Sequence, residues 1–228
     1  MNINKYIITG GIIAFQLLSC IIKQGGKTDI KEEEIETNVS PSSIFDGVSL
    51  DGWEITNFVL PGLVYVSRGE ILLEMGDGCT GITLIETPPE MEYQLSLDAK
   101  RVAGNDFFCG LTFPVNDYFC SLIVGGWGGS LVGLSCIDRK DASDNETTSW
   151  MTFNDNQWYH ITVEVSNGKI KAVIDEQTVI DFTIGNHYLS VRPEVLKNIP
   201  LGIATWHTTA AIKNIRLEKI TQTTCVDD

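Results

Sequence analysis

Short segments of alternating apolar and polar residues follow one another from residue 44 to residue 220. Gly, Asn, Asp and Pro separate these segments at intervals of about ten residues, and no convincing helix longer than a turn or two interrupts them. A period of two residues is that of a half-buried β-strand, and many short strands with regular turns are typical of a sandwich or barrel. The pattern therefore predicts an all-β domain of two packed antiparallel sheets.

The clearest alternation covers residues 158–165, where Tyr159 and every second residue after it are apolar. Asn167 and Gly168 follow, and this pair is the favoured one for a two-residue type I′ turn. The next strand-like segment is 169–174. Together these features predict an antiparallel hairpin.

A second predicted hairpin joins residues 107–113 to residues 118–124 through a four-residue turn from Pro114 to Asp117. Both strands are nearly continuous in apolar and small residues, so we expect them to lie centrally and to be covered on both faces. We place the last strand, 212–220, beside the first strand, which brings the two ends of the domain together.

Residues 1–19 have the pattern of a signal peptide, with one positive charge at Lys5, an apolar run and the small residue Ser19. The run is too short and too rich in glycine for a membrane-spanning helix, which needs about 20 residues. The sequence Leu-Leu-Ser-Cys ending at Cys20 resembles the lipobox of bacterial lipoproteins, in which the leader is removed and this cysteine carries the acyl chains. The alternative is an ordinary cleaved signal with a fortuitous cysteine.

The segment 20–43 contains a Gly-Gly pair, an acidic run at 32–34 and Pro41, without an apolar period. This composition predicts a disordered acidic tether, and residues 221–228 form a short polar tail. We therefore expect an exported protein, lipid-anchored in the cell envelope at the outer membrane or cell surface. Its single folded domain would be 44–220.

Charge narrows the range of partners. The chain has 30 Asp and Glu residues against 16 Lys and Arg, which gives a formal net charge of −14. Such a charge repels phosphate backbones and anionic lipid surfaces. Nucleic acid is therefore not an expected partner and membrane contact is expected through the lipid anchor only, whereas neutral ligands such as sugars fit the charge.

Five cysteines remain once the leader cysteine is set aside, and an odd number cannot all pair. Their spacing matches neither a dense disulfide framework nor a CxxC or metal-ligand pattern. Most are expected to be small buried core residues, with the last one free on the polar tail, and the sequence leaves their pairing open. They are Cys79, Cys109, Cys120, Cys136 and Cys225.

Two motifs at the ends of the domain resemble a known family. The opening, 44–53, reads Ile-Phe-Asp-Gly-Val-Ser-Leu-Asp-Gly-Trp, and the ending combines Leu-Gly-Ile-Ala-Thr-Trp at 201–206 with Ala-Ile-Lys-Asn-Ile-Arg-Leu at 211–217. Both are similar to the corresponding parts of the 3-keto-disaccharide hydrolase domain family. The resemblance implies a concanavalin A-like, laminin G-like jelly roll with a carbohydrate-related role, often in exported lipoproteins.

Within the opening motif, Asp46 and Gly47 form a turn pair, and Trp53 is a large apolar residue. These residue types predict a turn followed by a side chain that closes the core of the sandwich. A ligand-binding role for them is the less favoured alternative.

The sequence Gly-Gly-Trp-Gly-Gly around Trp127 directly follows an apolar strand. Glycines let the backbone bend and approach a ligand, while the indole ring is presented as a stacking platform. The alternative is a wide loop or bulge in which Trp127 packs into the core. We expect the stretch 125–147 to be a loop that carries the ligand site.

The ten residues 138–147 include four carboxylates. Oxygen-rich loops of this kind can hold Ca²⁺ or supply a general base, although the spacing does not match an EF-hand and a solvated surface loop is the alternative. Asp138 and Glu146 flank the loop and are candidate catalytic residues. No other cofactor is indicated.

Three further polar residues stand in apolar or glycine-rich surroundings: Asp106, Arg192 and His207. Each taken alone fits a structural ion pair or a surface position. Together with Trp127 and Trp206 they would make a sugar site at one end of the sandwich. Aromatic faces stack on the C–H surfaces of pyranoses, and Arg and carboxylate groups bond to their hydroxyls.

No Ser-His-Asp order, His-Glu-x-x-His motif or paired-carboxylate strand is present, which disfavours an ordinary two-carboxylate glycosidase. The resemblance implies cleavage of a 3-keto-glycoside. For that reaction we take Asp138 or Glu146 as the candidate base for the C2 proton. Arg192 or a bound metal would stabilise the enolate, and His207 would protonate the leaving oxygen.

The competing interpretations are a non-catalytic carbohydrate-binding module on the cell surface and a structural or partner-binding envelope lipoprotein. Several carboxylates gathered with His207 in one pocket would favour the enzyme. An exposed tryptophan on a shallow face would favour the binding module.

Overall fold

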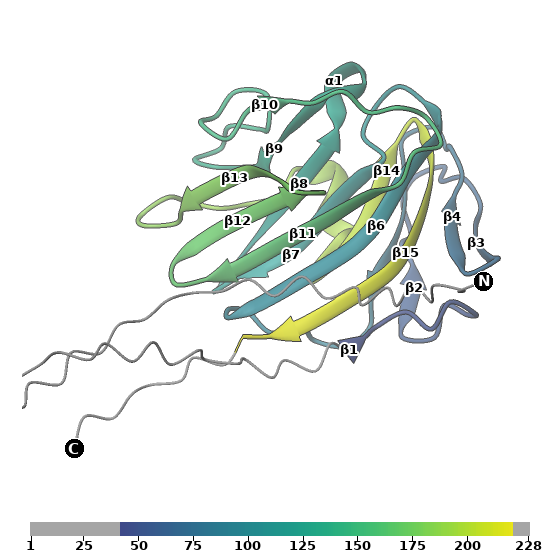
Figure 1. The fold of residues 1–228 in the computed structure, drawn as a ribbon, viewed down its shortest axis with the longest axis horizontal. Helices are drawn as coiled ribbons and strands as arrows, with labels where there is room; N and C mark the ends of the chain where they lie inside the picture. The colour runs from purple at the N-terminus through teal and green to yellow at the C-terminus, as the bar shows by residue number, and fades with distance from the viewer. Residues whose placement is uncertain (1–41, 221–228) are drawn as a thin grey trace, which may run out of the picture. The chain divides into compact units, whose positions relative to one another are not determined.

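The computed structural model describes residues 42–220, which form two packed antiparallel sheets (Figure 1). The eight-stranded sheet consists of β1 (Ser42–Ser43), β3 (Val64–Ser67), β4 (Glu70–Leu73), β6 (Tyr93–Gly104), β11 (Tyr159–Ser166), β12 (Lys169–Ile174), β13 (Gln177–Thr183) and β15 (Thr208–Lys219). The seven-stranded sheet consists of β2 (Trp53–Ile55), β5 (Cys79–Leu84), β7 (Cys109–Val115), β8 (Tyr118–Gly125), β9 (Leu131–Ser135), β10 (Ser149–Trp150) and β14 (Gly202–Trp206).

The first sheet has the order β13-β12-β11-β6-β15-β4-β3, with β1 paired to β15, and the second has the order β10-β9-β8-β7-β14-β5-β2. The helical segments within residues 42–220 are the turn α1 (Gly126–Gly129) and the 3₁₀ helix η1 (Pro193–Asn198). This architecture confirms the predicted all-β jelly-roll sandwich. In the same part of the chain, no helix has the length and apolar character needed to cross a membrane.

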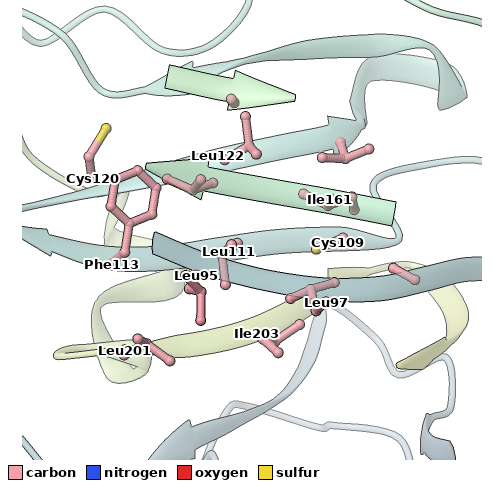
Figure 2. Packing of buried hydrophobic residues seen from close by; sticks show 14 of the residues in the cluster. Leu95, Leu97, Cys109, Leu111, Phe113, Cys120, Leu122, Ile161, Leu201 and Ile203 are labelled. Atoms are coloured by element: carbon pink, nitrogen blue, oxygen red, sulfur yellow. The ribbon is translucent and has the colours of Figure 1, made fainter. Parts of the chain in front are cut away.

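The hydrophobic core lies between the two sheets. Leu95 and Leu97 of β6 and Ile161 of β11 pack there with Leu111 of β7 and Ile203 of β14 (Figure 2). All five side chains are completely buried, and burial of each contributes about 1.5–3 kcal/mol. Because successive residues of a strand point to opposite faces, the residues between them lie on the outer faces of the sheets.

The predicted hairpin of β11 and β12 is confirmed. The two strands pair from Ser166 with Lys169 to Ile161 with Ile174. Asn167 has φ 49° and Gly168 has φ 69°, as a type I′ turn requires.

The second hairpin is also present and central in its sheet, but its turn is shorter than predicted. β7 continues through Pro114 and Val115, and Val115 pairs with Tyr118, so the turn itself holds two residues. Proline is tolerated here because β14 pairs with β7 only as far as Thr112, so no neighbouring strand needs the missing N–H. The Pro114 carbonyl accepts a hydrogen bond from the Tyr93 hydroxyl at 2.6 Å.

The two ends of the described chain meet, as predicted. β1 pairs with β15 through Ser42 with Leu217. The opening motif forms a turn and a core side chain: Asp46 Oδ1 accepts hydrogen bonds from the backbone N–H groups of Val48 and Ser49, at 2.7 and 2.8 Å. Trp53 is buried, and its Nε1 donates to a main-chain carbonyl at 2.7 Å.

A second prediction about the fold is wrong. The stretch 125–147 is not a single loop, because β9 runs through it and pairs with β8 on one side and β10 on the other. The sequence Leu-Val-Gly-Leu-Ser of β9 is buried on both faces, so it shows no alternation. A short apolar run of this kind cannot be recognised by its period.

Within residues 42–220 the four cysteines, Cys79, Cys109, Cys120 and Cys136, are unpaired and buried, as predicted for most of the cysteines. Burial raises the thiol pKa of Cys79, Cys109 and Cys120 to about 12, so these groups stay protonated. The predicted signal peptide, the Cys20 lipid anchor, most of the tether and Cys225 fall outside the described residues and stay predictions.

Candidate functional site

A cleft of about 250 Å³ lies on the outer face of the seven-stranded sheet. Ser121 and Ile123 of β8 and Ser135 of β9 line it, whereas the intervening residues Leu122 and Val124 point into the core. The full lining is Cys79, Asp106, Phe107, Ser121, Ile123, Trp127, Ser135, Arg192, Glu194, Val195 and Trp206. Strand alternation therefore supplies a base of mostly small side chains beneath larger aromatic and charged ones.

Trp127 lies at the edge of this cleft, in the turn α1 that connects β8 to β9. Gly125 and Gly128 on either side have φ 78° and 89°, and Trp127 itself has φ 48°, a left-handed conformation that is costly for a residue with a side chain. The indole is 41% exposed. The glycine turn thus presents the ring at the surface, and the alternative in which Trp127 packs into the core is excluded.

Asp106 and Phe107 approach the same cleft from the connection between β6 and β7. The Asp106 carboxylate accepts a hydrogen bond from the Phe107 backbone N–H at 2.7 Å, and the Asp106 backbone N–H donates to Thr208 Oγ1 at 3.1 Å. Gly110 makes room for the Phe107 ring, because a Cβ atom at position 110 would lie only 2.9 Å from that ring. Both side chains are half-buried.

The 3₁₀ helix η1 and Arg192, which precedes it, contribute further residues to the cleft lining. Asn198 is completely buried, and its Nδ2 donates to the Ile82 carbonyl of β5 at 2.9 Å. Gly202 leaves space for this contact, because a Cβ there would lie 2.3 Å from Asn198 Nδ2. Val195 packs in a small apolar cluster that includes Cys79 and Trp206. Residues 192–194 are therefore held in a fixed position over the sheet.

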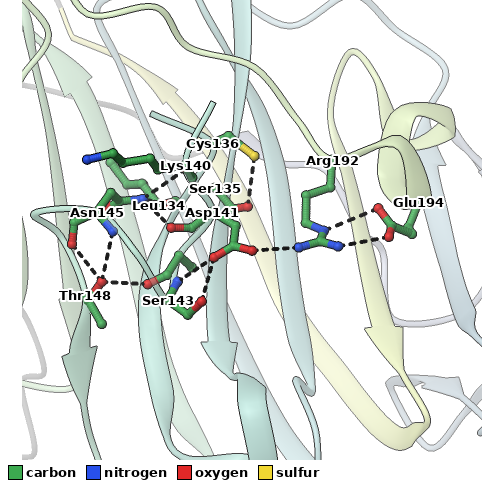
Figure 3. A network of polar contacts seen from close by, with 11 residues as sticks. Leu134, Ser135, Cys136, Lys140, Asp141, Ser143, Asn145, Thr148, Arg192 and Glu194 are labelled. Atoms are coloured by element: carbon green, nitrogen blue, oxygen red, sulfur yellow. Dashed lines mark hydrogen bonds and ion pairs between the residues drawn. The ribbon is translucent and has the colours of Figure 1, made fainter. Parts of the chain in front are cut away.

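Arg192 is bound by two carboxylates (Figure 3). Its Nε and Nη2 donate to the two oxygens of Glu194 at 3.3 and 3.0 Å, and its Nη1 donates to Asp141 Oδ2 at 2.8 Å. The hydrogen bonds that Arg192 donates to Glu194, and the charges of Glu194 and Asp141, raise the pKa of Arg192. The same hydrogen bond lowers the pKa of Glu194. These contacts fix the guanidinium group at the side of the cleft.

The loop that supplies Asp141 is held by its own polar side chains. Asn145 Nδ2 donates to the carbonyls of Leu134 and Asp141 at 2.8 and 2.7 Å, and Asp141 Oδ1 accepts from the Ser143 hydroxyl at 2.6 Å. Thr147 Oγ1 donates to Asn145 Oδ1 at 2.6 Å. Much of the polar character of this loop is therefore used to fold it.

Trp206 connects the cleft to a neighbouring groove. The ring is half-buried and lines both the cleft and a groove of about 280 Å³, and Cys79 and Glu194 also line both. Phe58, Asp77, Lys197 and other residues complete the groove. The candidate site therefore continues from the cleft into this groove.

The four residues expected to bind ligand, Asp106, Trp127, Arg192 and Trp206, all line the one cleft. The three residues expected to be catalytic do not line it. His207 is exposed, and its ring lies edge-on to that of Trp206 with 4.9 Å between the centroids.

Asp138 and Glu146 meet on a different side of the acidic loop. Asp138 Oδ2 lies 2.7 Å from His187 Nδ1, and His187 Nε2 lies 3.7 Å from Glu146 Oε1. The hydrogen bond with His187 is the main cause of the lowered pKa of Asp138. The physical reason for this placement is a tight turn, in which Asp138 and Arg139 have φ 50° and 66°.

The four carboxylates of the acidic loop do not gather into one cluster. Of the loop carboxylates, Asp138 bonds to His187 and Asp141 to Arg192. Across residues 42–220 no group of three or more His, Cys, Asp or Glu side chains is arranged to hold a metal ion.

Sequence reasoning missed Asp141 and Glu194 as parts of the site. Asp141 lies inside the acidic loop, and nothing in the sequence distinguishes it from its neighbours. For Glu194 a signal was present, because Arg-Pro-Glu at 192–194 places opposite charges two residues apart across a proline. It is the start of η1 that brings the two groups together.

Several solved structures share the fold. A candidate glycosyl hydrolase from Parabacteroides distasonis aligns with TM-score 0.52 and 14% identity over 78% of this chain and 93% of that one. A Bacillus subtilis protein of unknown function with a galectin-like fold aligns with TM-score 0.56 and 8% identity over 80% and 100%. The VIP36 exoplasmic/lumenal domain, solved with Ca²⁺ and Man3GlcNAc, aligns with TM-score 0.53 and 10% identity over 80% and 90%.

No curated protein matches the chain. A family model does: the 3-keto-alpha-glucoside-1,2-lyase-like domain matches residues 40–218, which covers the whole sandwich apart from the last two described residues. This match confirms the resemblance seen at the two ends of the domain. Together with the structural neighbours, it supports a carbohydrate-related function. The chain belongs to the 3-keto-alpha-glucoside-1,2-lyase-like domain family.

Proposed function

We propose that the domain binds a glycoside, with one sugar ring in the cleft on the seven-stranded sheet. The observation that carries the proposal is the convergence of Trp127 and Trp206 with Arg192 and Asp106 in one hollow of about 250 Å³. Aromatic rings offer flat apolar faces to the C–H surface of a pyranose, and charged groups bond to its hydroxyls. Sites that combine an apolar lining with a few fixed polar groups are typical of small-ligand binding.

The polar groups are already oriented before a ligand arrives. A guanidinium group has five N–H donors, and three of those of Arg192 are held by Glu194 and Asp141, which leaves two for sugar oxygens. Ser121 and Ser135 also line the cleft, and the Ser121 hydroxyl is hydrogen-bonded to Thr112 Oγ1 at 2.8 Å. A pre-organised site of this kind loses little conformational entropy on binding.

A second candidate function is elimination from a 3-keto-glycoside, and family membership favours it. Its requirement is a base near the acidic C2 proton. Asp106 is the carboxylate in the cleft lining that is not bound to Arg192. We therefore place the base at Asp106 rather than at Asp138 or Glu146, which do not reach the cleft.

The step balances without a further reactant. Asp106 takes the C2 proton, and the electrons of the C2–H bond pass into an enolate whose oxygen accepts hydrogen bonds from Arg192. The C1–O bond then breaks as the C1–C2 double bond forms. The aglycone oxygen takes the proton back from Asp106, so the products are an alcohol and a conjugated ketone.

Calorimetric titration of the full chain with methyl glycosides and disaccharides, methyl α-glucoside and maltose among them, tests the binding proposal. We expect saturable binding that Trp127→Ala weakens. Absence of binding to every member of the panel would contradict the proposal.

The elimination is tested with the 3-keto forms of the same sugars, by following the ultraviolet absorbance of the conjugated ketone. Asp106→Asn is expected to stop its formation while sugar binding persists. The matched control is Asp117→Asn, in the exposed turn between β7 and β8. Binding of the 3-keto sugars without any absorbance change in the unaltered chain would leave the domain a binding module.

We also propose that this domain is displayed on the cell envelope through acyl chains on Cys20. The support is the leader and the lipobox-like sequence before that cysteine. Mass spectrometry of the mature N-terminus tests it, since an unmodified Cys20 or a start at another residue would contradict the anchor.

A further inference from the structure

The charges around the cleft are unequal. Among the described side chains that line it, Arg192 is the only cation, whereas Asp106 and Glu194 are both acidic. Asp141 adds a third carboxylate just behind the lining, through its contact with Arg192. The net charge around the cleft is therefore negative, as is the formal net charge of the whole chain.

The positive charge of Arg192 is already neutralised. The guanidinium lies 3.0 Å from Glu194 Oε1 and 2.8 Å from Asp141 Oδ2, so two full negative charges face one positive charge. An incoming carboxylate or sulfate could approach Arg192 only beside these two groups. Like charges at such distances repel, and the repulsion is strongest where protein rather than water surrounds them.

Asp106 adds a carboxylate that no ion pair within residues 42–220 neutralises. One oxygen accepts the Phe107 backbone N–H at 2.7 Å, and the group is half-buried near aromatic side chains. An ammonium group placed there would gain from the carboxylate and from the faces of neighbouring aromatic rings. A negatively charged group would gain from neither.

From this arrangement we infer that the cleft selects its sugar by charge: it accepts neutral sugars and amino sugars and excludes uronic acids and sulfated or phosphorylated sugars. The inference rests on the proposed sugar binding and specifies its ligand class. Asp106 is the residue that sets the preference, and Asp141 contributes to it by neutralising Arg192 from behind. Exclusion through an unfavourable contact is a usual source of specificity.

The test uses three ligands that differ only at C6: methyl α-glucoside, its 6-amino-6-deoxy derivative and its 6-carboxylate, methyl α-glucuronide. Calorimetric titration of the full chain at low ionic strength is expected to show the amino sugar binding at least about tenfold more tightly than the glucuronide. The ratio of the two dissociation constants should fall as salt is added, because about 0.1 M salt screens charges beyond roughly 10 Å.

Asp106→Asn is expected to reduce that ratio by about tenfold, because the shape of the side chain is kept while its charge is removed. Asp141→Asn should change the ratio in the same direction, although Asp141 does not line the cleft. Asp117→Asn removes the same charge from the exposed β7–β8 turn and controls for the net charge of the chain.

Two results would overturn the inference. One is a glucuronide that binds as tightly as the amino sugar, and the other is an Asp106→Asn variant whose ratio changes no more than that of Asp117→Asn. Binding of neutral methyl α-glucoside separates the two proposals, since it supports sugar binding whatever the charge preference is. If none of the three sugars binds, the proposed function itself fails.

Discussion

Two tryptophans that stand beside glycines in the sequence have opposite positions in the fold. Trp53 follows Gly52 and is 4% exposed, whereas Trp127 stands between Gly126 and Gly128 and is 41% exposed. The first closes the core, and the second lines the cleft. A glycine next to an aromatic residue is therefore no guide to its role.

The backbone conformation at each tryptophan distinguishes the buried ring of Trp53 from the exposed ring of Trp127. Trp53 begins the strand β2, pairs with Leu84 and donates its indole N–H to the Ile44 carbonyl. Trp127 has φ 48° and occupies a turn in which the chain reverses between β8 and β9. An extended backbone delivers a ring to one face of a sheet, whereas a left-handed turn carries it beyond the end of the strand. Strain held at Trp127 is of the kind that accompanies functional positions.

Replacement of Trp53 by Ala should have the largest effect on stability. It removes a buried indole and leaves the Ile44 carbonyl without its partner, so we expect a loss of about 3–5 kcal/mol in the free energy of unfolding. Urea unfolding followed by circular dichroism measures this. A loss below about 1 kcal/mol would mean that the motif does not close the core.

Replacement of Trp127 by Ala should act on binding instead. Loss of one aromatic platform is expected to weaken sugar binding by roughly 1–3 kcal/mol, while the free energy of unfolding changes by less than about 1 kcal/mol because the ring is largely outside the core. Parallel titration and unfolding of the same variant measure both. A strongly destabilised variant with normal sugar affinity would remove Trp127 from the site.

Much of the fold could be predicted because it depends on local patterns. The β11–β12 hairpin follows from alternation and an Asn-Gly pair, and β15 beside β1 follows from the position of the two ends. β9 was not predicted because its residues are buried on both faces and show no alternation of apolar and polar positions. The length of the β7–β8 turn was misjudged because a proline inside a strand resembles a turn residue.

The site was predictable only in part. Aromatic and charged residues in unusual surroundings pointed to Asp106, Trp127, Arg192 and Trp206, which the sandwich gathers from four separate connections and strands. The residues with which these side chains form ion pairs and hydrogen bonds were not predictable from the sequence. The contact between Asp141 and Arg192 spans 51 residues of sequence and depends on how β9 and η1 are placed.

Two glycines give a matched pair that sharpens the comparison. Gly52 has φ 83° and Gly128 has φ 89°, and a Cβ at either position would meet no atom within 4 Å. Each change to Ala should therefore cost only the strain of a left-handed conformation, about 1 kcal/mol. Titration is expected to show weaker sugar binding for Gly128→Ala alone, since only that turn orients Trp127. Equal effects of the two variants on binding would contradict a specific role of the turn.

The smallest expected effect is the change of stability with pH that arises from the ion pair of Arg192 and Glu194 beside the cleft. Glu194 has its pKa lowered from 4.5, chiefly by the hydrogen bond from Arg192. A carboxyl whose pKa is lower in the folded state contributes stability that is present above its unfolded value, near 4.5, and is lost as the pH falls through the lowered pKa. Both side chains are 40% exposed, so solvent screening keeps this contribution to about 1 kcal/mol or less. Urea unfolding should show that Glu194→Gln is less stable than the unaltered chain at pH 7, and that this difference becomes smaller at pH 3. A stability difference that is the same at both pH values would mean that the ion pair does not hold η1 over the cleft.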